Sequence, residues 1–463
     1  MFSASEGNFY LSGNFAPVEQ EISAAQLPVT GSLPRDLNGR YIRIGPNPRG
    51  DVDPATYHWF TGPGMVHGIR LRDGRAEWYR SRFVEGSDGV LNTEKHAAPN
   101  TNVIAHGGRI LTLIESGTPP AELDPEFAGT TVLAEDEAFG SGFTAHPKLD
   151  PATGELHAVT FSITQGTARY VVLDPEGRTK HTTDIDVDDN PMLHDMALTE
   201  TRAIVLDLPV TLAAAIRCME AGEPVSTLPM IWDEQHPARV GVLPIGGTSD
   251  QINWVEVPRC YVFHILNAFD NPDGSFTLDV VRYDELFLRD MLGPGGSVPT
   301  LVRWTVNPAT GKTSEDVICD YSVEFPRIDG RLTGRPHRYG WFAGYGAGGI
   351  EITDDVERAH TRDGFETGPL VKVDTVLGVT QLHDYGPGRV TMEPAFVPRS
   401  DSTSEQDDGW ILSVVHDGNV NRAELVVLDA ADITAAPVAR VHLPARIPFG
   451  FHGNWIDDRE LGL

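Results

Sequence analysis

Cysteine is scarce in this chain of 463 residues. Only Cys218, Cys260 and Cys319 are present, far apart and without a CxxC pair. An odd and sparse set of cysteines argues against a disulfide framework, and it also argues against a metal site built from thiolates.

Basic residues are the second shortage. The chain has 36 Lys and Arg against 66 Asp and Glu, which gives a net charge of −30. Such a field repels phosphate backbones and anionic lipid headgroups, so we expect no nucleic-acid partner. Apolar contact with a membrane surface stays open, and the ordinary explanation of the acidity is solubility in a salty cytoplasm.

Long apolar runs are also missing. No stretch reaches the ~18 residues that a membrane-spanning helix needs. The N-terminal segment MFSASEGNFYLSGNF has neither the basic region nor the apolar region of a signal peptide. These absences predict a soluble, cytoplasmic protein, with peripheral membrane contact as an additional option.

Strand-like segments are abundant instead, and they recur from end to end. The clearest are 109–115, 155–163, 169–174, 202–208, 261–266, 276–283, 301–306, 410–416 and 423–429. They are rich in Val, Ile, Leu and aromatic residues and are bounded by Gly, Pro, Asp and Asn, as short β-strands are. We therefore expect an all-β fold, and four-stranded blades of roughly 60–70 residues each would make about seven blades of a β-propeller.

One segment, TLAAAIRCMEAG (211–222), reads as a helix, with Leu212, Ile216 and Met219 on one face. This face could pack on the propeller or dip into lipid at the mouth of a substrate tunnel. No Gly/Ser linker or charge run divides the chain, so we expect residues 1–463 to form one propeller domain, with a cap made by insertions between blades.

Four of the 16 histidines stand out by their sequence context. They are His146 in FTAHPKLD, His194 in MLHDMAL, His264 in YVFHILNAFD and His452 in GFHGNW. Their spacing matches no local metal-binding motif, and a hydrogen-bonded core histidine is the ordinary alternative for each. Spacing alone does not select these four.

Ten segments, in the same order along the chain, resemble the carotenoid cleavage oxygenase family. That family includes apocarotenoid oxygenases and lignostilbene dioxygenases. The segments are GRYIRIGPNP (39–48), YHWFTGPGMVHG (57–68), NTNVIAHGGRILTLIESGTP (100–119), FTAHPKLDPATGEL (143–156), LHDMALTE (193–200), VFHILNAFD (262–270), VEFPRID (323–329), EPAFVPR (393–399), DDGWILSVVHD (407–417) and FGFHGNW (449–455).

The resemblance implies a seven-bladed β-propeller with a loop and helix cap, and a non-haem Fe(II) on its axis. Transferred position by position, the iron ligands are His146, His194, His264 and His452. Three glutamates that would support those ligands are Glu115, Glu324 and Glu393. A threonine near the open face of the iron corresponds to Thr101.

These residue types suit the implied chemistry. Four neutral imidazoles leave two octahedral positions of Fe(II) for O₂ or water. Buried carboxylates then compensate the charge of the metal and fix the tautomer of each imidazole. Zinc fits less well, because structural zinc usually includes cysteine and catalytic zinc usually has three protein ligands and a water. For Thr101, the ordinary alternative is a hydrogen bond within a turn.

The implied reaction is cleavage of a carbon–carbon double bond, with O₂ supplying oxygen to two carbonyl products. Family members that cleave phenolic stilbenes carry a lysine directly before the glutamate that corresponds to Glu115, with a tyrosine upstream. Here that position is Ile114, and no tyrosine lies between Phe83 and Glu115. A buried Ile offers no donor to a phenolate, which favours an apocarotenoid or another apolar polyene as substrate.

Three alternatives stay open at this stage. The same iron centre could cleave a stilbene or a phenylpropene, or it could perform isomerase chemistry of the kind that one branch of the family performs. The chain could also be a propeller without catalytic activity. The resemblance further implies that the last strand reaches the propeller axis at His452, where Gly450 and Gly453 would leave room near the metal.

Overall fold

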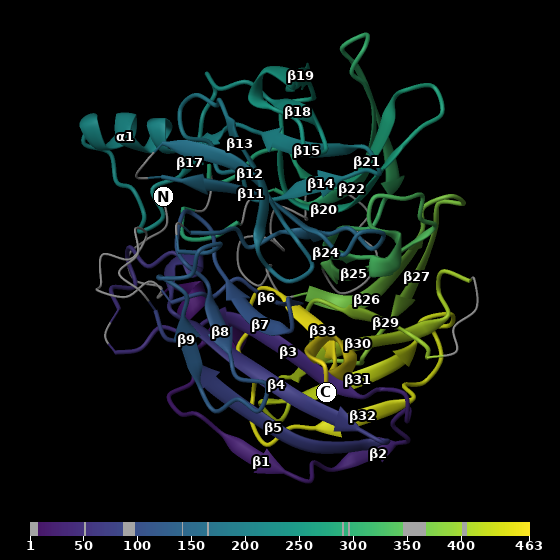
Figure 1. The fold of residues 1–463 in the computed structure, drawn as a ribbon. Helices are drawn as coiled ribbons and strands as arrows, with labels where there is room; N and C mark the ends of the chain where they lie inside the picture. The colour runs from purple at the N-terminus through teal and green to yellow at the C-terminus, as the bar shows by residue number, and fades with distance from the viewer. Residues whose placement is uncertain are drawn as a thin grey trace.

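The computed structural model describes residues 8–50, 52–86, 98–140, 142–163, 166–288, 291–294, 297–345, 367–400 and 405–463. Antiparallel sheets form the seven blades of a β-propeller around one axis (Figure 1). The all-β expectation is confirmed, and each of the nine strand-like segments named above coincides with an observed strand.

The first four blades follow one another along the chain, and each has four strands. Blade 1 consists of β6 (Asn102–His106), β7 (Arg109–Leu113), β8 (Ala121–Leu123) and β9 (Thr130–Val132). Blade 2 consists of β10 (Lys148–Leu149), β11 (Leu156–Ser162), β12 (Thr167–Leu173) and β13 (Thr179–Ile185). Blade 3 consists of β14 (Met196–Leu198), β15 (Arg202–Asp207), β18 (Arg239–Pro244) and β19 (Asn253–Glu256). Blade 4 consists of β20 (Tyr261–Asp270), β21 (Phe276–Tyr283), β22 (Thr300–Asn307) and β23 (Lys312–Cys319).

The remaining three blades include the strands that close the ring. Blade 5 consists of β24 (Val323–Arg327), β25 (Tyr339–Tyr345), β26 (Thr367–Asp374) and β27 (Val379–His383). Blade 6 consists of β28 (Arg389–Thr391), β29 (Ala395–Pro398), β30 (Gly409–Asp417), β31 (Arg422–Asp429), β32 (Ala439–His442) and β2 (Val29–Gly31). Blade 7 consists of β33 (Gly453–Asp457), β3 (Gly39–Pro46), β4 (Gly64–Arg72), β5 (Arg75–Phe83) and β1 (Ser23–Ala25).

Both ends of the chain contribute to ring closure. The C-terminal β33 pairs with β3, while β1 and β2 from the N-terminal segment add outer strands to blades 7 and 6 (Figure 1). After β33, the carboxylate of Asp458 accepts two hydrogen bonds of 2.6 Å from Arg70 and one of 3.0 Å from Arg40. Both guanidinium groups are fully buried. The expectation that the end of the chain closes the ring is confirmed.

Helical structure is sparse among the described residues. Short 3-10 helices are η1 (Phe9–Leu11), η2 (Gly13–Phe15), η3 (Trp59–Thr61), η4 (Ser249–Gln251), η5 (Gly330–Leu332) and η6 (Asp458–Leu461). The α-helix α1 (Leu212–Glu220) lies in an insertion between β15 and β18, beside the two-stranded ribbon of β16 (Val210–Thr211) and β17 (Ile231–Trp232). None of the described helices is long and apolar enough to cross a membrane.

The apolar face of α1 is only partly packed. Thr211 caps the helix by accepting a hydrogen bond of 3.1 Å from the Ala214 amide, and Ala214 and Ala215 form its buried side. Leu212 packs against the core of the propeller, whereas Ile216 and Met219 are 42% and 49% exposed. In Figure 1 the helix stands at the edge of the molecule. The helix is therefore packed at Leu212, and lipid contact of Ile216 and Met219 stays a prediction.

Candidate metal centre

The four histidines that the sequence singles out converge at the inner edges of four blades. His146 and His194 precede the inner strands β10 and β14 by two residues, His264 lies in β20, and His452 immediately precedes β33. The ring centroid of His146 lies 4.4 Å from that of His194, 5.2 Å from that of His264 and 4.6 Å from that of His452. All four rings are buried. The ring of blades brings together residues that are up to 306 positions apart because the inner strands meet at the axis.

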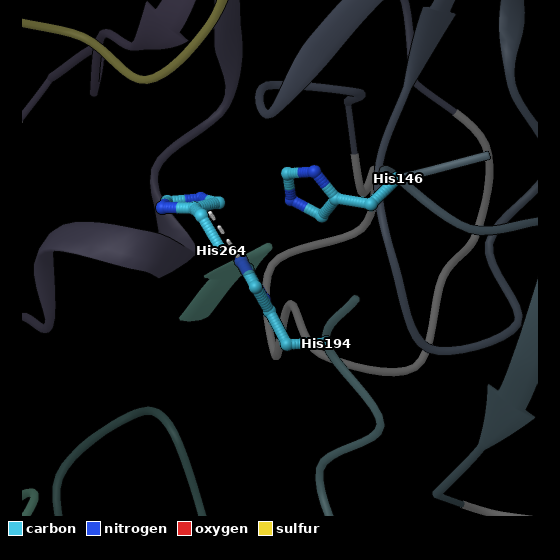
Figure 2. A group of neighbouring side chains, drawn as sticks. All are labelled: His146, His194 and His264. Atoms are coloured by element: carbon cyan, nitrogen blue, oxygen red, sulfur yellow. Dashed lines mark hydrogen bonds between the residues drawn. The ribbon is translucent and has the colours of Figure 1, made fainter. Parts of the chain in front are cut away.

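The ring nitrogens face one another. One nitrogen each from His146, His194 and His264 form a group within 4.8 Å of one another. Figure 2 shows the three rings turned toward a common centre, and it marks the 3.5 Å contact between Nε2 of His194 and Nε2 of His264. His452 adds a fourth ring, with its centroid 4.8 Å from that of His264.

Each of the three predicted glutamates contacts one imidazole from behind, at Nδ1. Glu115 lies 2.5 Å from Nδ1 of His194, Glu324 2.6 Å from Nδ1 of His264, and Glu393 2.9 Å from Nδ1 of His452. His146 has no carboxylate at such a distance among the described residues, since Glu115 lies 3.8 Å from its Nε2. The contacts of Glu324 and Glu393 are hydrogen bonds, whereas Glu115 and Nδ1 of His194 are close without hydrogen-bond geometry. A carboxylate hydrogen-bonded at Nδ1 selects the tautomer that carries the proton there, which leaves the Nε2 lone pair facing the centre.

This arrangement suits a divalent cation. Nε2 of His194 and Nε2 of His264 lie 3.5 Å apart, and with both Nδ1 atoms protonated their two lone pairs would face each other and repel. Nε2 of His146 is buried and has no hydrogen-bond partner among the described residues. A cation bound among these nitrogens would remove the repulsion between the lone pairs and would give Nε2 of His146 a partner. An all-imidazole donor set without thiolate is typical of a non-haem transition-metal site and not of structural zinc.

The absence of a proton on the metal-facing nitrogen favours metal binding at two of the imidazoles. Burial and the neighbouring histidines hold the pKa of His146 well below its usual value, and burial lowers the pKa of His452 to about 4 despite the charge of Glu393. Both rings are therefore neutral near pH 7. At His264 burial acts in the same direction, but the charge and hydrogen bond of Glu324 outweigh it and the pKa is raised.

The backbone is distorted where it presents these groups. β20 departs from regular pairing with β21 between Val262 and Asn267, which places His264 inside an irregular segment. Phe325, directly after Glu324, has φ of +54°, and Ser116, directly after Glu115, has φ of +66°. Bulges and left-handed residues of this kind re-aim side chains and concentrate at functional sites.

Three supporting residues were not predicted from the sequence. Asp195 accepts a hydrogen bond of 2.9 Å from the Ile265 amide and lies 2.7 Å from Nζ of Lys148. It thereby connects the segments that carry His194, His264 and His146. Its position directly after His194, in LHDMA, was the available signal.

Asn102 and Arg327 connect the other segments. Asn102 donates to the main-chain oxygen of Ala145 at 2.7 Å and accepts a hydrogen bond of 3.1 Å from Asn454. Arg327 lies 3.3 Å from Glu393, and it also donates to the main-chain oxygen of Gly453. Each histidine is therefore held by its own strand and by a side chain from another blade.

Thr101 directly precedes β6 of blade 1, and it lies against the segment that carries His452. Its main-chain oxygen accepts a hydrogen bond of 3.2 Å from the His452 amide, and its hydroxyl donates to Asn100 at 2.7 Å. The hydroxyl is thus engaged within its own turn, as the ordinary alternative for this residue requires.

Aromatic side chains surround one side of the histidines. The ring of Phe263 lies 5.0 Å from that of His194, and the ring of Phe325 lies 5.5 Å from His264 and 5.6 Å from His452. Behind them, successive ring contacts connect further aromatic residues. These are Trp59, Phe60, Phe287 and Phe451. The rings form an apolar aromatic wall next to the candidate metal centre.

The two glycines around His452 allow a close approach of the backbone beside this residue. A Cβ on Gly450 would lie 2.8 Å from the Ile44 oxygen, and a Cβ on Gly453 would lie 2.8 Å from Cγ of Arg43. Both glycines thus make room for the neighbouring strand β3 next to the segment that carries His452.

Comparison with known proteins agrees with this architecture. Residues 15–457 match the family model described as retinal pigment epithelial membrane protein. A carotenoid cleavage oxygenase from Mycobacterium tuberculosis is 38% identical, with 98% of each chain covered. The chain belongs to the carotenoid cleavage oxygenase family. This membership makes the protein an oxygenase that acts on a carbon–carbon double bond, and the family is iron-dependent.

Solved structures of family members share the fold. The lignostilbene dioxygenase of Pseudomonas brassicacearum superposes with a TM-score of 0.85 at 26% identity and covers 97% of this chain and 98% of its own. The cobalt-substituted apocarotenoid oxygenase of Synechocystis gives a TM-score of 0.81 at 27% identity, with 95% and 97% covered. These matches confirm the expected propeller.

Proposed function

We propose that this carotenoid cleavage oxygenase uses Fe(II) held by His146, His194, His264 and His452 to cleave an apolar polyene of the apocarotenoid class. The observation that carries the assignment of the ligands is the convergence of the four buried rings, with carboxylates on Nδ1 of three of them. When bound, the iron would supply the activation of O₂ that yields two carbonyl products.

The chain's own residues would hold and insulate this site. Glu115, Glu324 and Glu393 keep the proton of each bonded imidazole on Nδ1 and offset the charge of the metal. Burial raises the pKa of Glu393, but the charge of Arg327 and the hydrogen bond with His452 outweigh burial and lower the pKa to about 2, so Glu393 is ionised. Thr101 would lie near the open face of the iron, because its main-chain oxygen accepts a hydrogen bond from the His452 amide.

The proposed substrate class rests on the aromatic wall and on Ile114. A wall of Phe and Trp rings binds an apolar chain by burial and excludes water from the reacting carbons. No group at position 114 can donate a hydrogen bond to a phenolate, which a phenolic stilbene would require. Stilbene cleavage by the same centre is the second candidate, supported by the structural match to a lignostilbene dioxygenase.

A product screen tests the proposal. The purified iron-loaded enzyme is incubated under ¹⁸O₂ with a β-apocarotenal and, separately, with resveratrol, and the aldehydes are identified by mass spectrometry. We expect labelled aldehydes from the apocarotenal and little product from resveratrol. Rapid turnover of resveratrol alone would replace the first candidate by the second, and product formation without O₂ uptake would indicate isomerase chemistry.

A further inference from the structure

A polar row crosses blade 7 behind the candidate metal centre. Arg43 on β3 pairs with Gly453 on one side and with His67 on β4 on the other, and His67 pairs in turn with Ser81 on β5. Residues paired across strands point to the same face of a sheet. Arg43, His67 and Ser81 are buried, although most neighbours on this face are apolar.

The guanidinium of Arg43 is only partly satisfied. Its Nη2 donates to the main-chain oxygen of Phe451 at 2.9 Å, whereas Nε and Nη1 are buried and make no hydrogen bond. The Tyr41 hydroxyl directs its proton to the main-chain oxygen of Glu393, at 3.0 Å, and its oxygen interacts with the Arg43 guanidinium, but Nε and Nη1 stay without a partner. A buried charged donor without a partner is costly, so a partner outside the chain is expected.

Arg43 lines a small cavity in the seam between blade 7 and the segment before β33. Its lining consists of Arg43, Ile44, Gly45, Pro46, Asn47, Met65, His67, Ile447 and Pro448. The volume of about 10 Å³ is the least that holds one water-sized particle. No carboxylate lines the cavity, and both side-chain polar atoms of Asn47 are taken by Val18, at 2.8 Å each.

His67 adds a donor to this cavity. Its Nδ1 lies 2.9 Å from the Tyr79 hydroxyl, which also interacts with Ser81. The Ile22 amide donates to Ser81 Oγ at 3.0 Å, and we assign the Ser81 proton to Tyr79 and the Tyr79 proton to Nδ1 of His67. In this tautomer the neutral imidazole carries its remaining proton on Nε2. Burial, with the charges of Arg43 and Arg446, holds the pKa of His67 down to about 3, so the ring stays neutral.

We propose that this cavity binds a single monatomic anion of the chloride class between Arg43 and His67. Its donors would be Nε and Nη1 of Arg43, which have no partner, and Nε2–H of the lining residue His67, and no carboxylate lines the cavity. A water molecule donates as well as accepts and would leave its own protons without partners among these side chains. The anion would offset the charge of Arg43 next to the strand that carries His452.

Halide-dependent stability tests the site without relying on activity. The melting temperature is measured in potassium gluconate, chloride and bromide at one ionic strength, because a chain of net charge −30 also responds to screening. We expect halide to raise the melting temperature by on the order of 1–2 °C, since a ligand of the folded state stabilises it. Arg43→Gln should lose this difference.

A matched control separates the site from a general loss of a buried polar group. His157 makes the same kind of pair with Tyr170, at 2.7 Å, in blade 2 and without an unpartnered guanidinium beside it. His157→Asn should therefore keep the full halide difference. An equal halide difference in Arg43→Gln and the unmodified protein would overturn the proposal.

Crystallography tests the anion site if the Arg43→Gln variant does not fold. Crystals of the unmodified protein grown in bromide should show an anomalous peak in the cavity beside Arg43. A water molecule there, with no bromide peak, would overturn the proposal.

Discussion

At the residue scale, the four histidines differ from the other buried histidines in lying ring against ring, with neighbouring ring centroids 4.4–5.3 Å apart. We expect His264→Ala and His452→Ala each to abolish both iron binding and double-bond cleavage, because each substitution removes one ligand and leaves a carboxylate without its imidazole. Iron per chain by plasma emission spectrometry and product analysis measure the two effects. His157→Ala removes a buried histidine away from the axis and should retain iron. Full iron content in either ligand variant would show that the assignment is wrong.

Changing one of the carboxylates that contact the imidazoles should weaken iron binding without abolishing it. Glu393→Gln keeps an acceptor for Nδ1–H of His452 but removes the charge that compensates the metal. We expect iron affinity to fall on the order of 10–100-fold without loss of the fold. Competition with a chelator of known affinity measures this change. Glu424→Gln, which breaks a rim ion pair with Arg440 at 3.0 Å, is the control and should leave iron affinity unchanged.

A histidine outside the centre should give stability a pH dependence. His236 is fully buried between Asp207, at 2.7 Å, and Asp189, at 3.1 Å. Burial lowers its pKa, but the hydrogen bonds and charges of both carboxylates outweigh burial and raise the pKa above 6.5. Its contribution to stability is therefore complete below about pH 6.5 and is lost as the pH rises through the raised pKa.

This pH dependence is tested by comparing the melting temperatures of the variant and the unmodified protein at pH 6 and pH 8. His236→Asn should lower the melting temperature more at pH 6 than at pH 8, because the neutral side chain cannot donate to both carboxylates. An equal decrease at the two pH values would contradict a protonated His236.

At the scale of secondary structure, the strands could be predicted from the sequence, whereas the supporting contacts of Asp195, Asn102 and Arg327 could not. Segments such as 276–283 are apolar, rich in β-branched residues and bounded by turn residues, so local pattern suffices. The bulge that turns His264 inward depends on pairing between β20 and β21, and the contacts of Asp195 and Asn102 depend on neighbouring blades. No local pattern encodes such contacts.

The exposed apolar side chains of α1 predict that the protein binds to a lipid surface. Burying Ile216 and Met219 in the interface of a bilayer would add apolar contact area, whereas the net charge of −30 disfavours anionic headgroups. We therefore expect binding to neutral phosphatidylcholine vesicles, and weaker binding for the double variant Ile216→Glu, Met219→Glu. Co-sedimentation measures it. Val317→Glu, at a site that is 63% exposed on the outer strand of blade 4, is the matched control and should bind as the unmodified chain does.

For the whole molecule, the site exists only because the ring is closed. The sequence spacing of the four histidines does not indicate a metal site, and only the resemblance to a known family predicted their convergence. The propeller explains why: each inner strand reaches the same axis, so ligands can lie in four different blades. The identity of these residues was predictable by comparison, whereas their geometry depends on the complete ring.

Ring closure and iron binding can be separated experimentally. Removing residues 451–463 takes away β33, His452 and Asp458 together, and it leaves the buried guanidinium groups of Arg40 and Arg70 without Asp458. Breaking a buried ion pair from one side costs about 3–5 kcal/mol, so we expect this truncation to abolish folding as well as iron binding. Asp458→Asn weakens the closure alone and should lower the melting temperature while iron is retained. His452→Ala removes the ligand alone and should lose iron while the ring stays closed. If the truncated chain melted cooperatively near the temperature of His452→Ala, β33 would be dispensable for closure and the last blade would be held by β1, β3, β4 and β5 alone.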